Sequence, residues 1–133
     1  MKTLSLKAIL LVLFFTAFAT TSCKKDKVQV PQPVIEGSWL GKYGSGNNTP
    51  NTFYSFNILP SGVLQIKAPN NGITGAGTWK LDGVNFKGVY TYSNSNETYN
   101  LAAKFDENAK TITGSWGEGD VSAGDGEFYL NKQ

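Results

Sequence analysis

Eight short segments of alternating apolar and polar residues, separated by turn signals, dominate the sequence after residue 34. The turn signals are clusters of Gly, Pro, Asn and Asp, such as Pro60-Ser61-Gly62 and Asp82-Gly83. Because successive side chains of a strand point to opposite faces, this alternation predicts strands with one buried and one solvated face. The predicted strands are residues 36–43, 52–59, 63–68, 75–81, 84–92, 97–105, 110–116 and 127–132.

The connections between these predicted strands are mostly short, so neighbouring strands are expected to pair as antiparallel hairpins. A meander of eight strands has two exposed edges unless the first and last strands pair. An all-β fold with a single antiparallel eight-stranded up-and-down β-barrel removes both edges. A two-sheet β-sandwich is the alternative. Residues 35–133 are enough for one such domain with one core.

The N-terminal segment has the pattern of a signal peptide, which we place at residues 1–22. Lys2 and Lys7 precede an apolar stretch at 8–19, which is too short to span a membrane as a helix. The stretch ends at Ser22-Cys23, which resembles the lipidation site of bacterial lipoproteins. The resemblance implies that Cys23 is lipidated and becomes the mature N-terminus. The alternative is a free thiol after an ordinary signal peptide.

Residues 23–34 form the lipidated N-terminus and an extended tether, because Pro31 and Pro33 disfavour a helix. In lipoproteins an aspartate directly after the cysteine often signals retention in the inner membrane. This chain has Lys24 there, so the resemblance implies anchoring in the outer membrane, on its periplasmic face or at the cell surface. The run Lys24-Lys25-Asp26 is loosely similar to the surface-export signals of Bacteroidetes lipoproteins.

The charge balance argues against nucleic acid as a partner. The chain has 12 basic and 10 acidic residues, but Lys2 and Lys7 lie in the predicted signal peptide and three further lysines in the tether. Residues 28–133 carry seven lysines and nine carboxylates. A nucleic-acid binder needs a basic face to neutralise phosphates, and this domain has no excess of positive charge to build one.

All three tryptophans stand two residues after a glycine, in Gly37-Ser38-Trp39, Gly77-Thr78-Trp79 and Gly114-Ser115-Trp116. Residues two apart share a face of a strand, so each glycine makes room for the indole or lets the strand bend. We therefore interpret the repetition as a packing device of the barrel. From the strand order, Trp39 and Trp79 are expected at one end of the barrel and Trp116 at the other.

The first of these units also carries a family resemblance. A Gly-x-Trp at the start of the first strand is similar to the motif of lipocalin-like barrels, and avidin-like barrels begin comparably. The resemblance implies that Trp39 packs across the closed end of the barrel beneath an arginine from the last strand. The sequence contains no arginine, and Lys132 is the candidate for that position.

Few residues in the chain could carry catalysis. Without histidine and with one cysteine, it offers no Ser-His-Asp or Cys-His arrangement and no typical zinc site. The acidic segment 118–127 contains Glu118, Asp120, Asp125 and Glu127, for which a calcium loop, a catalytic carboxylate pair and a solvated turn are the alternatives. The solvated turn is preferred, so no enzyme, metal or cofactor is expected.

The aromatic residues suggest a site for a ligand. A closed eight-stranded barrel either fills with side chains or holds one small ligand. Many tyrosines alternate onto the inward faces, which suits a small hydrophobic or semi-polar ligand. The candidate ligand-binding residues are Trp39, Tyr43, Tyr54, Trp79, Tyr90, Tyr92, Tyr99 and Trp116.

Two classes of function follow. The first is a non-catalytic, membrane-anchored protein of the cell envelope that binds a small ligand inside its barrel. The second is a protein-interaction or inhibitor module, a filled barrel that contacts an envelope protein through loops 44–51, 69–75 and 117–126.

Overall fold

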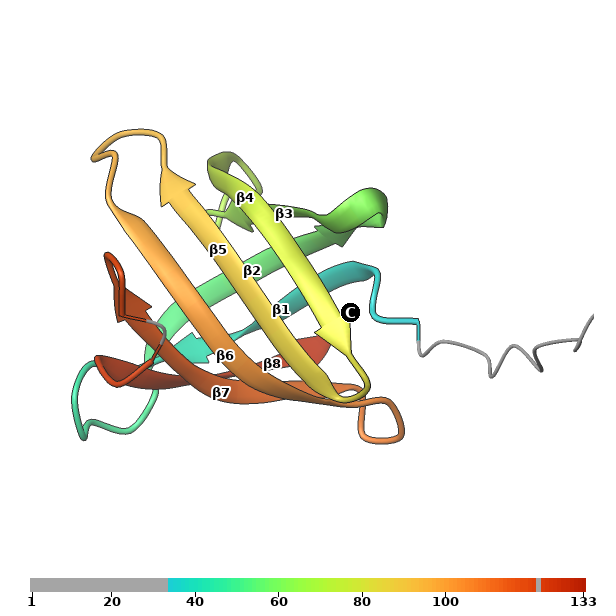
Figure 1. The fold of residues 1–133 in the computed structure, drawn as a ribbon. Coiled ribbons are helices and arrows are strands. Elements are labelled where there is room, and N and C mark those ends of the chain that lie inside the picture. The colour runs from blue at the N-terminus through green and yellow to red at the C-terminus, as the bar shows by residue number, and fades with distance from the viewer. Residues whose placement is uncertain (1–33, 122) are drawn as a thin grey trace, which may run out of the picture. The chain divides into compact units, whose positions relative to one another are not determined.

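The computed structural model describes residues 34–121 and 123–133, which form one closed barrel of eight antiparallel strands in sequence order (Figure 1). The predicted signal peptide and all of the predicted tether except Val34 lie outside the described residues. Among the described residues, no helix is long and apolar enough to cross a membrane. The strands are β1 (Gly37–Tyr43), β2 (Thr52–Leu59), β3 (Val63–Lys67), β4 (Ile73–Asp82), β5 (Asn85–Tyr92), β6 (Thr98–Asp106), β7 (Thr111–Glu118) and β8 (Gly126–Lys132), with a short 3-10 turn, η1 (Pro60–Gly62).

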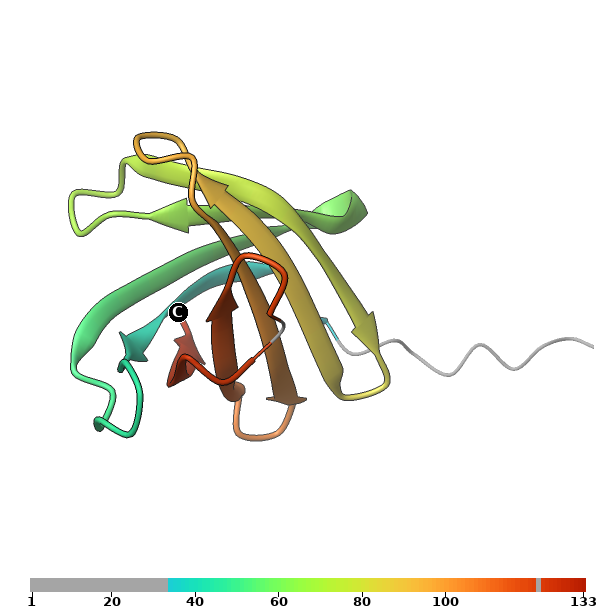
Figure 2. The same ribbon diagram turned by 60° about the vertical axis from the view of Figure 1, so that its left-hand side comes forward.

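The barrel closes because β1 pairs with both β2 and β8. Trp39 on β1 lies opposite Phe56 of β2 on one side and opposite Lys132 of β8 on the other. Every other strand pairs with its sequence neighbours, and the strands wrap around one interior (Figure 2). The predicted up-and-down barrel is confirmed, and the sandwich alternative is excluded.

Two strands extend two residues or more beyond the bounds that the alternation of residues indicated. β4 begins at Ile73 rather than at residue 75, because Ile73 pairs with Lys67 across a register shift. β7 continues past Trp116 to Glu118, which pairs with Tyr99. Backbone pairing thus extends both hairpins beyond the residues whose side chains alternate cleanly.

The two ends of the barrel differ in their connections. We call the end formed by residues 60–62, 83–84 and 107–110 the closed end, where Ile35 also packs. We call the end formed by the four loops 44–51, 68–72, 93–97 and 119–125 the open end. Each of these four loops connects two consecutive antiparallel strands at that end of the barrel (Figure 1).

The half of the interior near the closed end is filled. Trp39 is fully buried, and its Nε1 donates to the Ile35 carbonyl oxygen at 2.9 Å. Its ring meets that of Phe105 edge-on at 5.9 Å. The Lys132 Nζ lies 5.8 Å from the centre of the Trp39 ring and donates to the Val34 carbonyl oxygen at 2.9 Å. Lys132 thus occupies the position predicted for it.

Trp79 also lies toward the closed end. Its Nε1 donates to the Leu59 carbonyl oxygen at 2.8 Å, where β2 ends, and its ring stacks on Phe86 at 6.5 Å. Trp116 lies at the open end, where its Nε1 donates to the Gly44 carbonyl oxygen at 2.9 Å. The predicted placement of the three tryptophans is confirmed.

The glycines of the repeated units mark places where strand backbones approach closely. A Cβ added at Gly77 would lie 1.9 Å from the Val89 carbonyl oxygen, and one at Gly114 would lie 2.2 Å from that of Ala102. Gly37 differs, because its φ of +136° favours glycine and its Cβ would meet only the Lys132 side chain. The second and third glycines therefore permit tight curvature of the sheet, as strand glycines do in barrels.

Candidate functional site

A cavity of about 210 Å³ lies at the open end of the barrel. Its lining comes from strands β1, β2, β5, β6 and β7 and from the first loop of the open end, and contains no charged side chain. The residues that line it are Tyr43, Ser45, Tyr54, Tyr90, Tyr92, Tyr99 and Trp116.

Five aromatic side chains form an uninterrupted circuit around this cavity, which we call the aromatic circuit. Tyr43 lies 5.1 Å from Tyr54 between ring centres, and Tyr54 lies 6.5 Å from Tyr90. Tyr90 stacks on Tyr99 at 5.5 Å, and Tyr99 lies 5.7 Å from Trp116. Trp116 closes the circuit with Tyr43 at 5.9 Å. Each ring comes from a different strand, so the barrel itself sets the spacing of the circuit.

Buried phenylalanines pack behind Tyr54, on the side of the barrel interior. Tyr54 packs on Phe56 at 4.5 Å and on Phe128 at 5.6 Å, both in edge contacts. Phe56 and Phe128 lie 6.3 Å apart, and both are almost completely buried. These rings separate the cavity from the packed interior around Trp39.

The polar atoms of the lining are held by hydrogen bonds. The hydroxyl groups of Tyr54 and Tyr90 are hydrogen-bonded at 2.8 Å, and the ring of Tyr92 packs edge-on against that of Tyr90 at 5.3 Å. The indole of Trp116 is fixed to the Gly44 carbonyl, and Gly126 leaves the space for it, since a Cβ there would lie 2.7 Å from Nε1. In the described part of the chain, no buried side-chain nitrogen or oxygen lacks a partner.

Burial keeps these tyrosines neutral. Desolvation raises the pKa of Tyr54 and that of Tyr90 well above the usual value for tyrosine, and it also raises the pKa of Tyr92. Desolvation raises the pKa of Tyr99 to about 12, with further contributions from Glu97 and Glu118. The wall of the cavity is therefore uncharged at neutral pH and offers hydroxyl donors and acceptors.

Two of the four loops that border this uncharged wall carry carboxylates. The four loops of the open end contain Glu97, Asp120 and Asp125 but no Lys, Arg or His. The Tyr99 hydroxyl donates to Glu97 Oε2 at 3.2 Å, which connects the lining to the rim. The ends of the neighbouring strands add Glu118 and Glu127 on the acidic side and Lys42 and Lys67 on the basic side, so carboxylates are in excess at this end of the barrel. An excess of one sign of charge around a concave site concentrates the opposite sign near its mouth.

The structure brings six of the eight predicted ligand residues together around this cavity, namely Tyr43, Tyr54, Tyr90, Tyr92, Tyr99 and Trp116. It separates the other two from it. Trp39 is enclosed at the closed end, and Trp79 packs on Phe86 near the same end, so neither lines the cavity. Their inclusion is corrected, because they share the inward face with the tyrosines but lie at other levels of the barrel.

The sequence prediction missed Ser45. This residue belongs to the loop after β1, where the surrounding Gly and Asn residues indicate only a turn. No alternation extends to it, so no sequence signal placed it at the cavity.

The acidic segment 118–127 is organised around its own backbone. The Asp125 Oδ2 accepts a hydrogen bond from the Glu118 amide at 2.8 Å. Among the described residues, no group of three or more His, Cys, Asp or Glu side chains is placed to hold a metal ion. This geometry suits the solvated turn preferred from the sequence.

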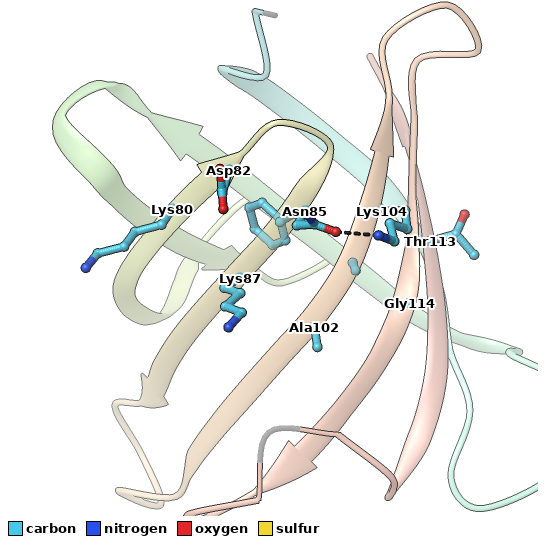
Figure 3. A pocket seen from close by; sticks show the side chains of 10 residues that line it. Lys80, Asp82, Asn85, Lys87, Ala102, Lys104, Thr113 and Gly114 are labelled. Atoms are coloured by element: carbon cyan, nitrogen blue, oxygen red, sulfur yellow. Dashed lines mark hydrogen bonds between the residues drawn. The ribbon is translucent and has the colours of Figure 1, made fainter.

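A second concavity of about 580 Å³, which we call the lysine groove, crosses the outer face of β4 to β7 (Figure 3). Its charged residues are Lys80, Lys87, Lys104 and Asp82. The ammonium of Lys104 is engaged by the Asn85 side chain, and Lys80 extends away from that contact (Figure 3). The lysine side chains do not converge on one point. The groove therefore does not direct several side chains at one small space, as the open-end cavity does.

Comparisons of the chain with protein families, with curated proteins and with solved structures found no match. The lipoprotein and lipocalin-like resemblances therefore stay predictions from short motifs. We therefore infer a function from the geometry of the two concavities.

Proposed function

We propose that the protein is a membrane-anchored lipoprotein of the cell envelope whose barrel binds a small ligand at its open end. The observation that carries this proposal is the 210 Å³ cavity bounded by the aromatic circuit. A filled barrel would need no such space. The hydroxyls of Tyr54 and Tyr90 make the site semi-polar rather than purely hydrophobic.

The size and shape of the site favour a compact ligand. A cavity of about 210 Å³ is comparable to cavities of ~150 Å³ that hold a single benzene ring. A ligand of this size is a single ring or a short branched group. Rigid aromatic side chains on five strands preorganise the site, which lowers the entropic cost of binding.

The chemistry of the lining favours binding over catalysis. General bases and nucleophiles are activated by a pKa close to the working pH or lowered toward it. The pKa shifts of Tyr54, Tyr90 and Tyr99 are in the opposite direction. The site thus holds neutral phenols that can orient a ligand by hydrogen bonds but are poor proton acceptors.

The membrane anchor in this proposal is the lipid on Cys23. The signal-like pattern before Cys23 and the two prolines of the tether support it, because they would place the barrel at a distance from the bilayer. Labelled fatty acid should be incorporated into the wild-type chain in a bacterial host and not into Cys23→Ala. Equal labelling of both chains would contradict the anchor.

Native mass spectrometry of the protein purified from its own membranes tests the ligand-binding function. We expect a stoichiometric small-molecule adduct beyond the mass of the lipid. The adduct should be lost in Tyr90→Leu, which removes a lining ring that stacks on Tyr99 and packs near Phe56. An adduct retained at full stoichiometry in that variant, folded by circular dichroism, would place the ligand elsewhere.

A second candidate function, a protein-interaction module, is supported by the lysine groove. Lys80 and Lys87 are direct cross-strand partners, and like charges placed opposite one another destabilise a sheet. An acidic segment of an envelope protein would relieve this repulsion. This candidate differs from the sequence prediction, because the surface lies on strands and not on loops 44–51, 69–75 and 117–126.

Crosslinking in intact cells tests this second candidate. A partner crosslinked to the wild-type chain should be lost when Lys80, Lys87 and Lys104 are all replaced by Gln. The control replaces Lys42 and Lys67, which lie outside the lysine groove, close to the open end of β1 and of β3. Equal loss in both variants would show that general charge, not the groove, holds the partner.

A further inference from the structure

The open-end cavity combines two features that together specify a class of ligand. Its wall consists of six aromatic side chains and one serine, without a charged group. Its rim carries carboxylates and no basic residue in any of the four loops of the open end. Aromatic walls attract cations through the ring quadrupole, and a carboxylate rim raises the local concentration of cations.

The same features disfavour other ligand classes. An anion would find no Lys, Arg or His in the lining and would be repelled by Glu97, Asp120 and Asp125. A small inorganic or primary ammonium ion would lose strong hydration without a carboxylate inside the cavity to replace it. A weakly hydrated cation with methyl groups on its charged centre loses little on entry and contacts ring surfaces directly.

The hydrogen-bonded hydroxyls suit the rest of such a ligand. The hydroxyls of Tyr54 and Tyr90 form a hydrogen bond, and desolvation raises the pKa of both and of Tyr92, so all three keep their protons at neutral pH. Phenolic oxygens in this state can accept a hydrogen bond from a ligand hydroxyl. A cavity of about 210 Å³ leaves room for a charged head with one short polar arm.

We propose that the open-end cavity binds a small quaternary ammonium group, as in choline, through the aromatic circuit and the carboxylate rim. The proposal rests on the ligand-binding function and names its ligand class. Tyr99 links the two parts of the site, because its ring stacks on Tyr90 and its hydroxyl bonds to Glu97.

Titration calorimetry with choline and with its uncharged isostere, which carries a tert-butyl group in place of trimethylammonium, tests this proposal. We expect choline to bind at least about fivefold more tightly than the isostere, the effect of one cation–π contact of about 1 kcal/mol. The preference should shrink as salt is added, since the rim carboxylates are exposed.

Variants separate the contributions of the wall and of the rim. Tyr99→Leu should weaken choline binding about fivefold, whereas Tyr99→Phe, which keeps the ring, should retain most of the affinity. Glu97→Gln should weaken it about twofold at low salt, and the matched change Glu107→Gln at the closed end should have no effect. Tyr99 is only partly buried and both Glu side chains are exposed, so these variants are expected to fold.

Two sources could supply the same group, the free amine or the headgroup of a lipid. Free choline and phosphatidylcholine vesicles are therefore titrated separately, and binding of either, lost in Tyr99→Leu, supports the proposal. Equal affinity for choline and its isostere would overturn the cation class but leave the ligand-binding function intact. Absence of choline binding to a protein that carries a native adduct would overturn it in the same way.

Discussion

Replacement of Gly77 by alanine should destabilise the barrel strongly, although alanine adds one methyl group. Gly77 lies on β4 between β3 and β5, opposite Leu64 and Tyr90. The new Cβ would lie 1.9 Å from the Val89 carbonyl oxygen and 2.6 Å from the Tyr90 Cα, and both are backbone atoms that cannot rotate away. β4 and β5 must therefore separate locally, with weakened hydrogen bonds. We expect a loss of about 3 kcal/mol in the free energy of unfolding, the upper part of the range for overpacking.

The matched control is Gly88→Ala on the neighbouring strand β5. Gly88 is buried, whereas Gly77 is partly buried, but an added Cβ at Gly88 would meet methyl groups of Leu101 at 3.1 Å and Leu64 at 3.2 Å, which can shift. We expect a change of about 1 kcal/mol or less there, because adaptable side chains absorb most of the contact. Thermal unfolding followed by circular dichroism should show a Tm lower by roughly 12–24 °C for Gly77→Ala, at about 4–8 °C per kcal/mol. Equal Tm values for the two variants would refute the role of Gly77 as a close-approach glycine.

Three further perturbations test the packing and the electrostatics of the barrel. Tyr90→Phe and Tyr54→Phe each remove the hydrogen-bond partner of the other buried hydroxyl, so each should cost about 1–3 kcal/mol by denaturant unfolding. Unchanged stability in both variants would contradict this hydroxyl pair. The pKa of Tyr99 is raised to about 12 in the folded chain, so the unfolded chain loses this proton first as pH rises above the usual tyrosine value of 10.0. Unfolding free energy should therefore fall from about pH 10 upward and fall less in Tyr99→Phe, and an identical pH dependence of the two chains would be the contrary result. Lys132→Met should cost about 0.5–1 kcal/mol through loss of the ammonium contact to Trp39, and unchanged stability in urea would argue against that contact.

The fold could be predicted largely from the sequence, because side-chain alternation is a direct consequence of strand geometry. Phe86 and Tyr90 on β5, and Phe128 and Leu130 on β8, are buried as their alternation indicated. Closure was predictable since eight short-looped strands would otherwise expose two edges. The ends of β4 and β7 were not, because they depend on pairing between backbones rather than on side-chain pattern.

The sequence predicted that inward-facing aromatic residues form the candidate site, but not which of them line the cavity. Alternation tells which side chains point inward, and it identified the tyrosines of the aromatic circuit. Strand order also indicated that Trp39 and Trp79 lie at the opposite end from Trp116, which the structure confirms. The ligand set nevertheless included all three, because the inward direction of a side chain does not tell at which level of the barrel a cavity lies. Ser45 required the conformation of a loop that no periodic pattern describes.

The indole N–H groups of the three tryptophans provide the most direct test of the central claim, that the ligand enters the open end above a filled interior. Trp116 lines the cavity, whereas Trp39 is enclosed by Ile35 and Phe105, and Trp79 bonds to the Leu59 carbonyl. In an NMR spectrum that resolves the three indole signals, we expect choline to shift the Trp116 signal saturably and to leave the other two in place. A saturable shift of the Trp39 or Trp79 signal, with Trp116 unmoved, would contradict the claim.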